Sequence, residues 1–267
     1  MEQLRVAVVG LGALGRVHLT NLSTLDSARL VRVHDTGLSE QDRHDIEAAG
    51  ATCTDLAGAL DPREVDAVIV ATPTDSHTPI ACQAIRNGVA VFSEKPLART
   101  AADARSIVEA AEQHGVKVAV GHVVRYFPEY AAAHELVTTR RMGPVAGARL
   151  ARLNAAPATA HDWYADAARS GGVLLDMAIH DLDWCLWAFG PVDRVYATRG
   201  GDAGAQVASV TLRHTSGQLS YLDASWRDSA FSTRLELVAA DGLYQVNGST
   251  AAGWQLQLAG STAGTYL

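Results

Sequence analysis

Short apolar runs alternate with amphipathic stretches along the first half of the chain. An apolar run bounded by turn residues is typical of a buried strand, whereas apolar residues recurring every three to four positions indicate a helix. Strands and helices that take turns predict βαβ units and a parallel sheet. The predicted strands are Leu4–Val9, Leu30–His34, Ala67–Val70, Ala90–Ser93 and Lys117–Val120, and the predicted helices are Leu14–Leu25, Ser39–Ala49, Pro79–Asn87 and Ala101–His114.

The pattern changes after about residue 122. Helices are predicted at Pro128–Val137 and Gly172–Ala188, with a strand at Val145–Leu153 between them. Alternating segments joined by tight turns follow, which indicates an antiparallel sheet. These segments are Val192–Thr198, Val207–Arg213, Leu219–Trp226, Leu235–Ala239 and Leu243–Val246. We therefore predict an α/β chain: a doubly wound parallel sheet over residues 1–122, then an α+β domain over 123–267 built on a largely antiparallel open sheet.

Composition narrows the class of protein. The chain has 267 residues and a formal net charge of −7, which argues against a nucleic-acid or anionic-membrane partner. No apolar run is long enough to span a membrane, and the N-terminus does not resemble a signal peptide. Cys53, Cys82 and Cys185 are few and unevenly spaced, as expected of reduced thiols. We expect a cytoplasmic protein.

Gly10-Leu11-Gly12-Ala13-Leu14-Gly15 matches the G-x-G-x-x-G dinucleotide-binding fingerprint. It follows a predicted strand and opens a predicted helix, and Asp35 ends the next strand about 20 residues beyond Gly15. The phosphates of a dinucleotide would lie against the positive N-terminus of that helix. The sequence therefore predicts that the first domain is a Rossmann domain.

Two further positions refine the cofactor prediction. Asp35 can accept hydrogen bonds from the adenosine ribose and would repel a 2′-phosphate, which favours NAD over NADP. The alternative for Asp35 is a turn residue at a strand end. Thr72, Pro73 and His77 follow another strand, at the sheet edge where ligands gather, and we expect them to border the cofactor. The alternative there is a turn that caps the next helix.

Asp176 and His180 lie four residues apart in the predicted helix that begins at Gly171-Gly172. Residues at i and i+4 share one face of a helix, so the carboxylate can orient the imidazole as a general base. An apolar stripe of Leu175, Ile179, Leu182 and Leu186 would lie on the neighbouring face. The alternative is a helix-dipole carboxylate beside a core histidine. A metal site formed with Asp183 is disfavoured, because a recognisable metal-binding spacing is lacking.

Glu94-Lys95-Pro96 ends another predicted strand, where a lysine would reach the same crevice. The peptide before Pro96 is a candidate for the cis form. An isolated lysine is usually a solvated surface charge. Here the strand-end position, the fingerprint and the Asp176/His180 helix favour a catalytic role.

Together these motifs resemble the Gfo/Idh/MocA oxidoreductase family, which includes glucose-fructose oxidoreductase and inositol dehydrogenases. The resemblance implies that Lys95, Asp176 and His180 form the catalytic set, and that Glu94 and Lys95 also contact the cofactor. It further implies that Arg125 faces the active site, with a structural ion pair as the alternative. Candidates for the substrate wall are His161, Asp162, Trp163 and Tyr164, because a mixture of aromatic and polar side chains suits sugar rings; the alternative is loop packing.

The resemblance also carries expectations about size and assembly. Family members continue into further helices, so we expect the second domain to be shortened at the C-terminus. Relatives commonly cover the open sheet with another subunit, so a homo-oligomer, a dimer or a tetramer, is expected.

Three functions fit these motifs. The first is an NAD(P)-dependent dehydrogenase that transfers a hydride from a secondary alcohol of a sugar, inositol or related polyol. The second is a glycosidase or lyase that oxidises a sugar transiently and returns the hydride. The third is a nucleotide-sensing protein without catalysis, against which the presence of Lys95, Asp176 and His180 speaks.

Overall fold

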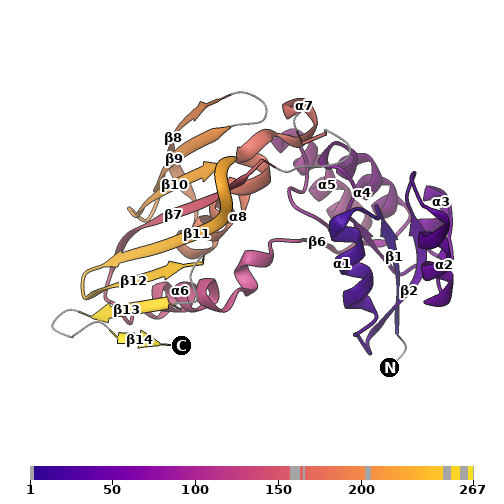
Figure 1. The fold of residues 1–267 in the computed structure, drawn as a ribbon, viewed down its shortest axis with the longest axis horizontal. Coiled ribbons are helices and arrows are strands. Elements are labelled where there is room, and N and C mark those ends of the chain that lie inside the picture. The colour runs from indigo at the N-terminus through magenta and orange to yellow at the C-terminus, as the bar shows by residue number, and fades with distance from the viewer. Residues whose placement is uncertain are drawn as a thin grey trace. The chain divides into compact units, whose positions relative to one another are not determined.

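The structure is a computed structural model of the chain. It describes residues 3–156, 163–164, 166–201 and 206–248, together with the backbone of two further strands, Trp254–Leu258 and Gly264–Tyr266. The chain divides into two compact units, Met1–Gly121 and His122–Leu267 (Figure 1). Each unit has its own sheet and its own hydrophobic core. Within the described ranges, every helix is too short or too polar to cross a lipid bilayer.

The first unit is built on a six-stranded sheet in the order β3-β2-β1-β4-β5-β6, with all pairs parallel. Strand order reverses between β1 and β4, which makes this a doubly wound Rossmann sheet and confirms the predicted fold. Its strands are β1 (Leu4–Val9), β2 (Ala28–His34), β3 (Thr52–Cys53), β4 (Ala67–Val70), β5 (Ala90–Ser93) and β6 (Val118–Val120). Its helices are α1 (Ala13–Leu22), α2 (Glu40–Ala48), α3 (Leu56–Ala59), the 3-10 turn η1 (Thr74–Ser76), α4 (His77–Arg86) and α5 (Ala101–His114).

Both faces of this sheet are buried, which explains the continuous apolar runs of its strands. In β1, Val6 and Val8 pack with Leu22 of α1, whereas Ala7 and Val9 belong to the core shared with α4 and α5. The predicted strands at β1, β4 and β5 match the structure residue for residue. The short β3 and α3 were not predicted, because their apolar runs are too short to distinguish a strand or a helix from a loop.

The second unit has an eight-stranded sheet in the order β14-β13-β12-β11-β7-β10-β9-β8. Neighbours are antiparallel except β7 and β10, which are parallel. The mixed, mostly antiparallel sheet confirms the predicted α+β fold class. The strands are β7 (Val145–Ala155), β8 (Val192–Gly200), β9 (Val207–His214), β10 (Leu219–Ser225), β11 (Arg227–Ala239), β12 (Gly242–Asn247), β13 (Trp254–Leu258) and β14 (Gly264–Tyr266). The helical segments are η2 (Val123–Tyr126), α6 (Pro128–Thr139), α7 (Ala167–Ser170), η3 (Leu174–Ala178) and α8 (Ile179–Phe189).

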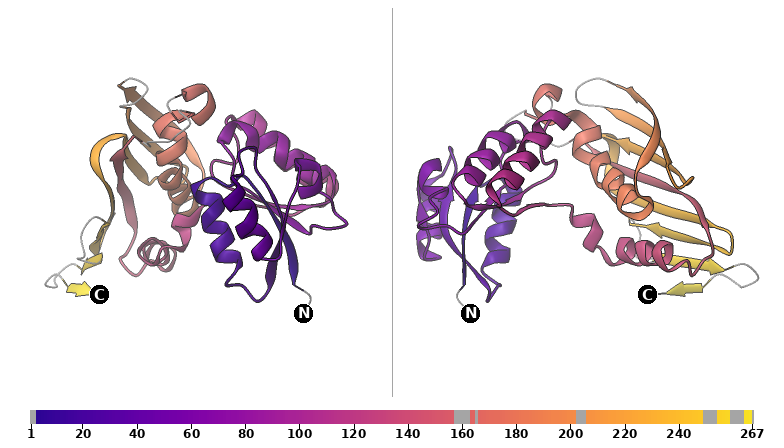
Figure 2. Two further views of the ribbon diagram at one scale, coloured as in Figure 1. Left: turned by 45° about the vertical axis from the view of Figure 1, so that its right-hand side comes forward. Right: turned by 180° about the vertical axis from the view of Figure 1, so that it is seen from behind.

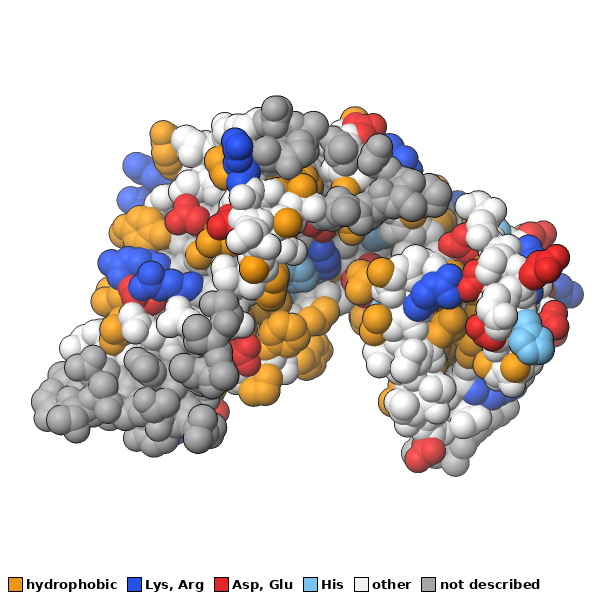
Figure 3. Space-filling view, viewed as in Figure 1, with side chains coloured by type: hydrophobic (Ala, Val, Ile, Leu, Met, Phe, Trp, Pro, Cys, Tyr) orange, Lys and Arg blue, Asp and Glu red, His pale blue; other side chains and the backbone are white. Residues whose placement is uncertain are grey.

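Helices α6 and α8 cover one face of the second sheet (Figure 2). Tyr130 of α6 and Trp184 of α8 are fully buried against strand residues, and the Trp184 indole N–H donates to the Tyr130 carbonyl at 3.1 Å. The strands also carry exposed large apolar side chains, Tyr196, Tyr221 and Phe231 among them. On the face that Figure 3 shows, hydrophobic and charged side chains of this unit both reach the surface.

Candidate functional site

Gly10 closes the turn after β1 with φ +95°. A Cβ at this position would lie 2.7 Å from backbone atoms of Ala71 and Thr72, which follow β4. Only glycine combines this conformation with so close an approach. The end of β1 therefore lies directly against the end of β4, at the point where the strand order reverses.

Gly12 and Gly15 shape the start of α1. A Cβ at Gly15 would overlap the carbonyl oxygen of Gly10, so the helix packs against its own leading turn. A Cβ at Gly12 would meet no described atom within 4 Å, and no described side chain caps α1. The leading N–H groups of α1 are therefore open to an anion, as the pyrophosphate of a dinucleotide requires.

Asp35 follows β2 and lies beside the fingerprint. Its carboxylate accepts the Leu11 N–H and the Gly37 N–H, each at 2.7 Å. These two bonds fix the side chain while leaving lone pairs on both oxygens. Asp35 can therefore accept hydrogen bonds from ribose hydroxyls, and the three glycines with Asp35 fit a dinucleotide.

His77 links the loops that follow β4 and β5. Its side chain is 1% exposed, and its ring nitrogens lie 2.8 Å from the Pro96 carbonyl oxygen and 2.9 Å from that of Thr72. The sequence predicted a cofactor contact for His77. In the structure both ring nitrogens face these carbonyls, so His77 holds the two loops together, and its contact with a cofactor stays a prediction. Thr72 and Pro73 are half-buried beside it.

Glu94 lies at the end of β5, directly before Lys95, and is 6% exposed. Its carboxylate lies 2.7 Å from His18 Nε2 of α1 and accepts the Lys95 N–H at 3.3 Å. The half-buried Lys95 is joined to the buried Pro96 by a cis peptide, as the sequence allowed. Sequence reasoning gave Glu94 a cofactor contact and gave His18 no specific role. The His18–Glu94 pair links the fingerprint helix to the lysine loop, and only the fold shows it.

The segment that carries Asp176 and His180 is not a regular α-helix. Gly171 and Gly172 precede it at φ +82° and +68°, and Leu174–Ala178 (η3) forms π-type hydrogen bonds before α8 begins at Ile179. Asp176 lies in the π segment and His180 in the first turn of α8, and both side chains are half-buried. The prediction of a regular α-helix is therefore wrong over Leu174–Ala178, whereas the pairing of Asp176 with His180 stays a prediction. Such segments occur frequently at functional sites.

The buried stripe of α8 also differs from the prediction. Leu186 is 48% exposed, and Leu175, Ile179 and Leu182 are only half-buried. The buried residues of α8 are Asp181, Trp184, Cys185 and Phe189. Trp184, Cys185 and Phe189 also recur at helical spacing, and theirs is the face of α8 that packs into the core.

Asp181 anchors the helix that carries His180, and the sequence analysis did not single it out. It lies next to His180, faces the core, and accepts two bonds from Arg152 of β7 at 2.8 and 3.1 Å. Burial alone would lower the pKa of the Arg152 guanidinium, but the Asp181 carboxylate raises it above its ordinary value. The signal in the sequence was its spacing of three and four residues before the apolar Trp184 and Cys185, which places it on their face of the helix.

Arg125 of η2 adopts the ion-pair alternative. Its guanidinium donates to both carboxylate oxygens of Asp183 on α8, at 2.7 and 2.6 Å, and lies 5.6 Å from the centre of the Trp187 ring. Asp183 raises the pKa of Arg125 through this pair. His122 Nε2 lies 3.7 Å from the same carboxylate.

Trp163 stacks on Tyr164, with ring centres 3.9 Å apart. His161 and Asp162 lie outside the described residues. In the part of the chain that the structure describes, no group of three or more His, Cys, Asp and Glu side chains is arranged to hold a metal ion.

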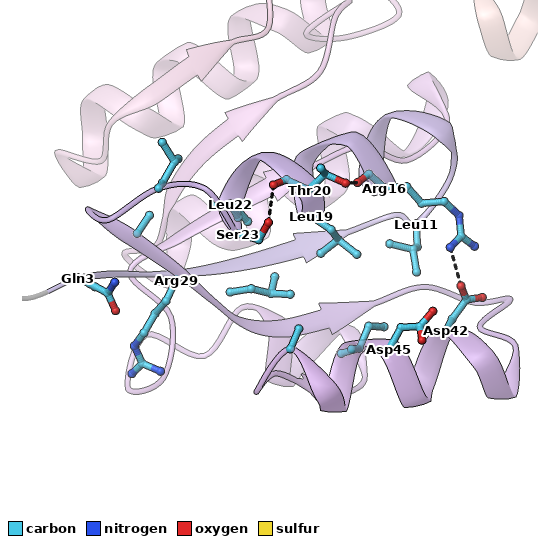
Figure 4. Close-up of a pocket in the computed structure, with 15 residues that line it drawn as sticks. Gln3, Leu11, Arg16, Leu19, Thr20, Leu22, Ser23, Arg29, Asp42 and Asp45 are labelled. Atoms are coloured by element: carbon cyan, nitrogen blue, oxygen red, sulfur yellow. Dashed lines mark hydrogen bonds and ion pairs between the residues drawn. The ribbon is translucent and has the colours of Figure 1, made fainter.

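A separate pocket of about 470 Å³ lies in the first unit between α1, β2 and α2 (Figure 4). Its lining is largely apolar, and the Arg16–Asp42 ion pair at 2.6 Å lies near one end. Leu11 is its sole fingerprint residue. The pocket therefore lies on the helix-covered face of the first unit and not at the strand ends where Gly10, Asp35 and Lys95 lie.

Comparison with protein families gives two matches along the chain. Residues 4–122 match the model described as oxidoreductase family, NAD-binding Rossmann fold (GFO_IDH_MocA). Residues 130–245 match the GFO/IDH/MocA C-terminal domain.

Individual relatives agree with these matches. The chain is 33% identical to scyllo-inositol 2-dehydrogenase (NAD(+)) of Bacillus subtilis over 193 residues, which cover 71% of this chain and 55% of that protein. It is 30% identical to inositol 2-dehydrogenase of Rhizobium meliloti over 251 residues, or 90% of this chain and 74% of that one. The crystal structure of GenD2 from gentamicin A biosynthesis, in complex with NAD, superimposes with a TM-score of 0.86 at 33% identity. That match covers 96% of this chain and 75% of GenD2.

Proposed function

Because the chain belongs to the GFO/IDH/MocA oxidoreductase family, we propose that it is an NAD-dependent dehydrogenase acting on a secondary alcohol of a sugar, inositol or related polyol. One observation carries the proposal. A glycine fingerprint with an open helix N-terminus occurs in the same chain as a helical segment bearing a half-buried carboxylate and imidazole. The inositol specificity of the relatives supports the substrate class.

Gly10, Gly12 and Gly15 would hold the pyrophosphate against the start of α1, and Asp35 would hold the ribose hydroxyls. Bound NAD supplies the hydride acceptor. The Asp35 carboxylate favours NAD over NADP, because a 2′-phosphate would meet a like charge. Glu94 and His77 would contribute by holding the loop that contains Lys95 and Pro96.

His180 accepts the proton of the substrate hydroxyl in the proposed reaction, and Asp176 orients the ring and stabilises its charged form. Lys95 donates a hydrogen bond to the substrate oxygen, which favours its developing negative charge. Arg125 holds Asp183 on α8, and Trp163 remains a candidate for the substrate wall. We also propose a homo-oligomer, because the strands of the second unit expose Tyr196, Tyr221 and Phe231.

The proposal is tested by incubating the protein with NAD or NADP and a panel of inositols, hexoses, amino sugars and sugar acids, while reduced nicotinamide is followed by its absorbance. We expect reduction of NAD with at least one polyol, and less with NADP. Product formed without accumulation of reduced cofactor would favour transient oxidation instead. Cofactor binding without turnover across the panel would favour the nucleotide-sensing alternative.

The proton acceptor is tested by His180→Ala. We expect kcat to fall by about 100-fold or more, because general-base catalysis contributes on that order, while NAD affinity stays nearly unchanged. His114→Ala, at the exposed end of α5, is the matched control and should keep full activity. Full activity of His180→Ala on the true substrate would show that the base assignment is wrong.

A further inference from the structure

Gln206 directly precedes β9, and its side chain reaches the helical segment that carries Asp176 and His180. The residue is 5% exposed. Its amide oxygen accepts the Val173 N–H at 3.1 Å, and its main-chain carbonyl accepts the Trp226 N–H at 2.8 Å. One residue therefore connects two strand ends with the first turn of the helix.

The first turn needs such a partner. The leading N–H groups of any helix lack acceptors within it, and i→i+5 bonding leaves more of them than an α-helix does. Here the Gly172 N–H donates to Ser170 Oγ at 3.0 Å and the Val173 N–H donates to Gln206. Ser170 is a neighbour in the chain, whereas Gln206 comes from the sheet. Gln206 is thus the contact that ties the helix start to the sheet.

Gly172 and Gln206 also fit each other sterically. A Cβ on Gly172 would overlap the amide oxygen of Gln206, and Gly172 has φ +68°. The missing side chain lets the amide lie against the helix backbone, which explains the second glycine of the Gly171-Gly172 pair.

We propose that Gln206 is a positioning residue for Asp176 and His180. By holding the Val173 N–H, it sets the depth and rotation of the turn from which Asp176 projects, and the helix continues from there to His180. The inference rests on the proposed function for its catalytic consequence, but the hold on the helix start can be measured without any substrate.

The test compares two variants of similar side-chain volume. Gln206→Met removes the acceptor, whereas Gln206→Glu keeps an acceptor oxygen at the helix N-terminus. Gln245→Met is the control, because Gln245 lies on β12 and donates to Glu236 at 2.7 Å, away from the helix start. For each full-length protein we would measure amide hydrogen exchange over residues 173–180, NAD affinity and, on the polyol found above, kcat and KM.

In Gln206→Met we expect exchange over residues 173–180 to rise by about tenfold or more, because a buried N–H loses its acceptor. We also expect kcat to fall about tenfold or more with NAD affinity unchanged, because misplaced catalytic groups lower the chemical rate. Gln206→Glu should restore both values, and Gln245→Met should change neither.

Unchanged exchange in Gln206→Met would overturn the proposal. A fall in kcat with unchanged exchange would also overturn it, since Gln206 would then act on the substrate directly. If the wild-type chain turns over no polyol, the proposed function fails, yet the exchange comparison still decides whether Gln206 holds the helix.

Discussion

Asp181 shows how one buried carboxylate can secure a functional helix. It follows His180 in the chain, but its side chain is buried in the core. There Arg152 donates to both of its oxygens, and the Tyr130 hydroxyl lies 3.3 Å from the same guanidinium. Both charged side chains are buried. Removing one charge would strand the other in the core, which costs much more than a surface ion pair is worth.

Asp181→Asn keeps the side-chain shape and removes the charge. We expect the free energy of unfolding to fall by about 3–5 kcal/mol, because Arg152 would be left buried without its counter-ion. The loss is measured by urea denaturation followed by circular dichroism. The matched control is Asp193→Asn, which breaks the half-exposed Asp193–Arg213 pair and should cost less than about 1 kcal/mol. Equal losses in the two variants would contradict a dominant role for burial.

At the scale of elements, α6 and α8 meet through a stacked pair of rings. His134 of α6 lies flat on Trp187 of α8, with ring centres 3.5 Å apart and planes 4° from parallel. Burial lowers the pKa of His134 below its ordinary value of 6.5; a hydrogen bond with the Trp187 backbone opposes this in part, and the nearby Arg125 adds to the lowering. The neutral ring is therefore the form that suits this helix contact.

This contact predicts a pH dependence of stability. Because the pKa of His134 is lower in the folded than in the unfolded chain, the unfolded chain binds more protons between the two values. The contribution is fully present above the unfolded pKa and is lost as the pH falls towards the folded one. We expect His134→Gln to reduce the loss of unfolding free energy between about pH 7.5 and 5, measured by urea titrations. An unchanged pH slope would contradict the assignment.

The elements also show what the sequence could predict. Strands β1, β4 and β5 followed from their apolar runs, and the fingerprint followed from local spacing, because both depend on neighbouring residues. The η3 segment did not, since its π-type hydrogen bonds leave no mark in the pattern of apolar residues. His18–Glu94, Arg152–Asp181 and Val173–Gln206 join distant parts of the chain, so only the fold could bring them together.

At the scale of the whole molecule, the two units bury their thiols differently. Cys53 and Cys82 of the first unit are half-buried, whereas Cys185 lies in the core of the second unit. Burial raises the pKa of the Cys185 thiol to about 12. Because the thiolate is the reactive form, Cys185 should be protected for as long as the second unit stays folded.

Titration with a thiol-reactive dye tests this difference. We expect reaction at Cys53 and Cys82 in the native protein and at all three cysteines in guanidinium, because unfolding restores access to Cys185. Cys185→Ala should leave the number of thiols that react in the native protein unchanged and lower the number that react in the denatured protein by one. Rapid reaction of Cys185 in the native protein would contradict the burial of this helix face.

The parallel pairing of β7 with β10 bears on how the chain is made. Both partners of β7, namely β10 and β11, begin after residue 218, so neither edge of this central strand can be satisfied when β7 leaves the ribosome. The first unit pairs its strands only with one another and can fold while synthesis continues. The nascent second unit must instead carry an unpaired strand, with Val145, Ala148 and Leu150 uncovered, until two later ones emerge. That interval is when a chaperone would be needed most.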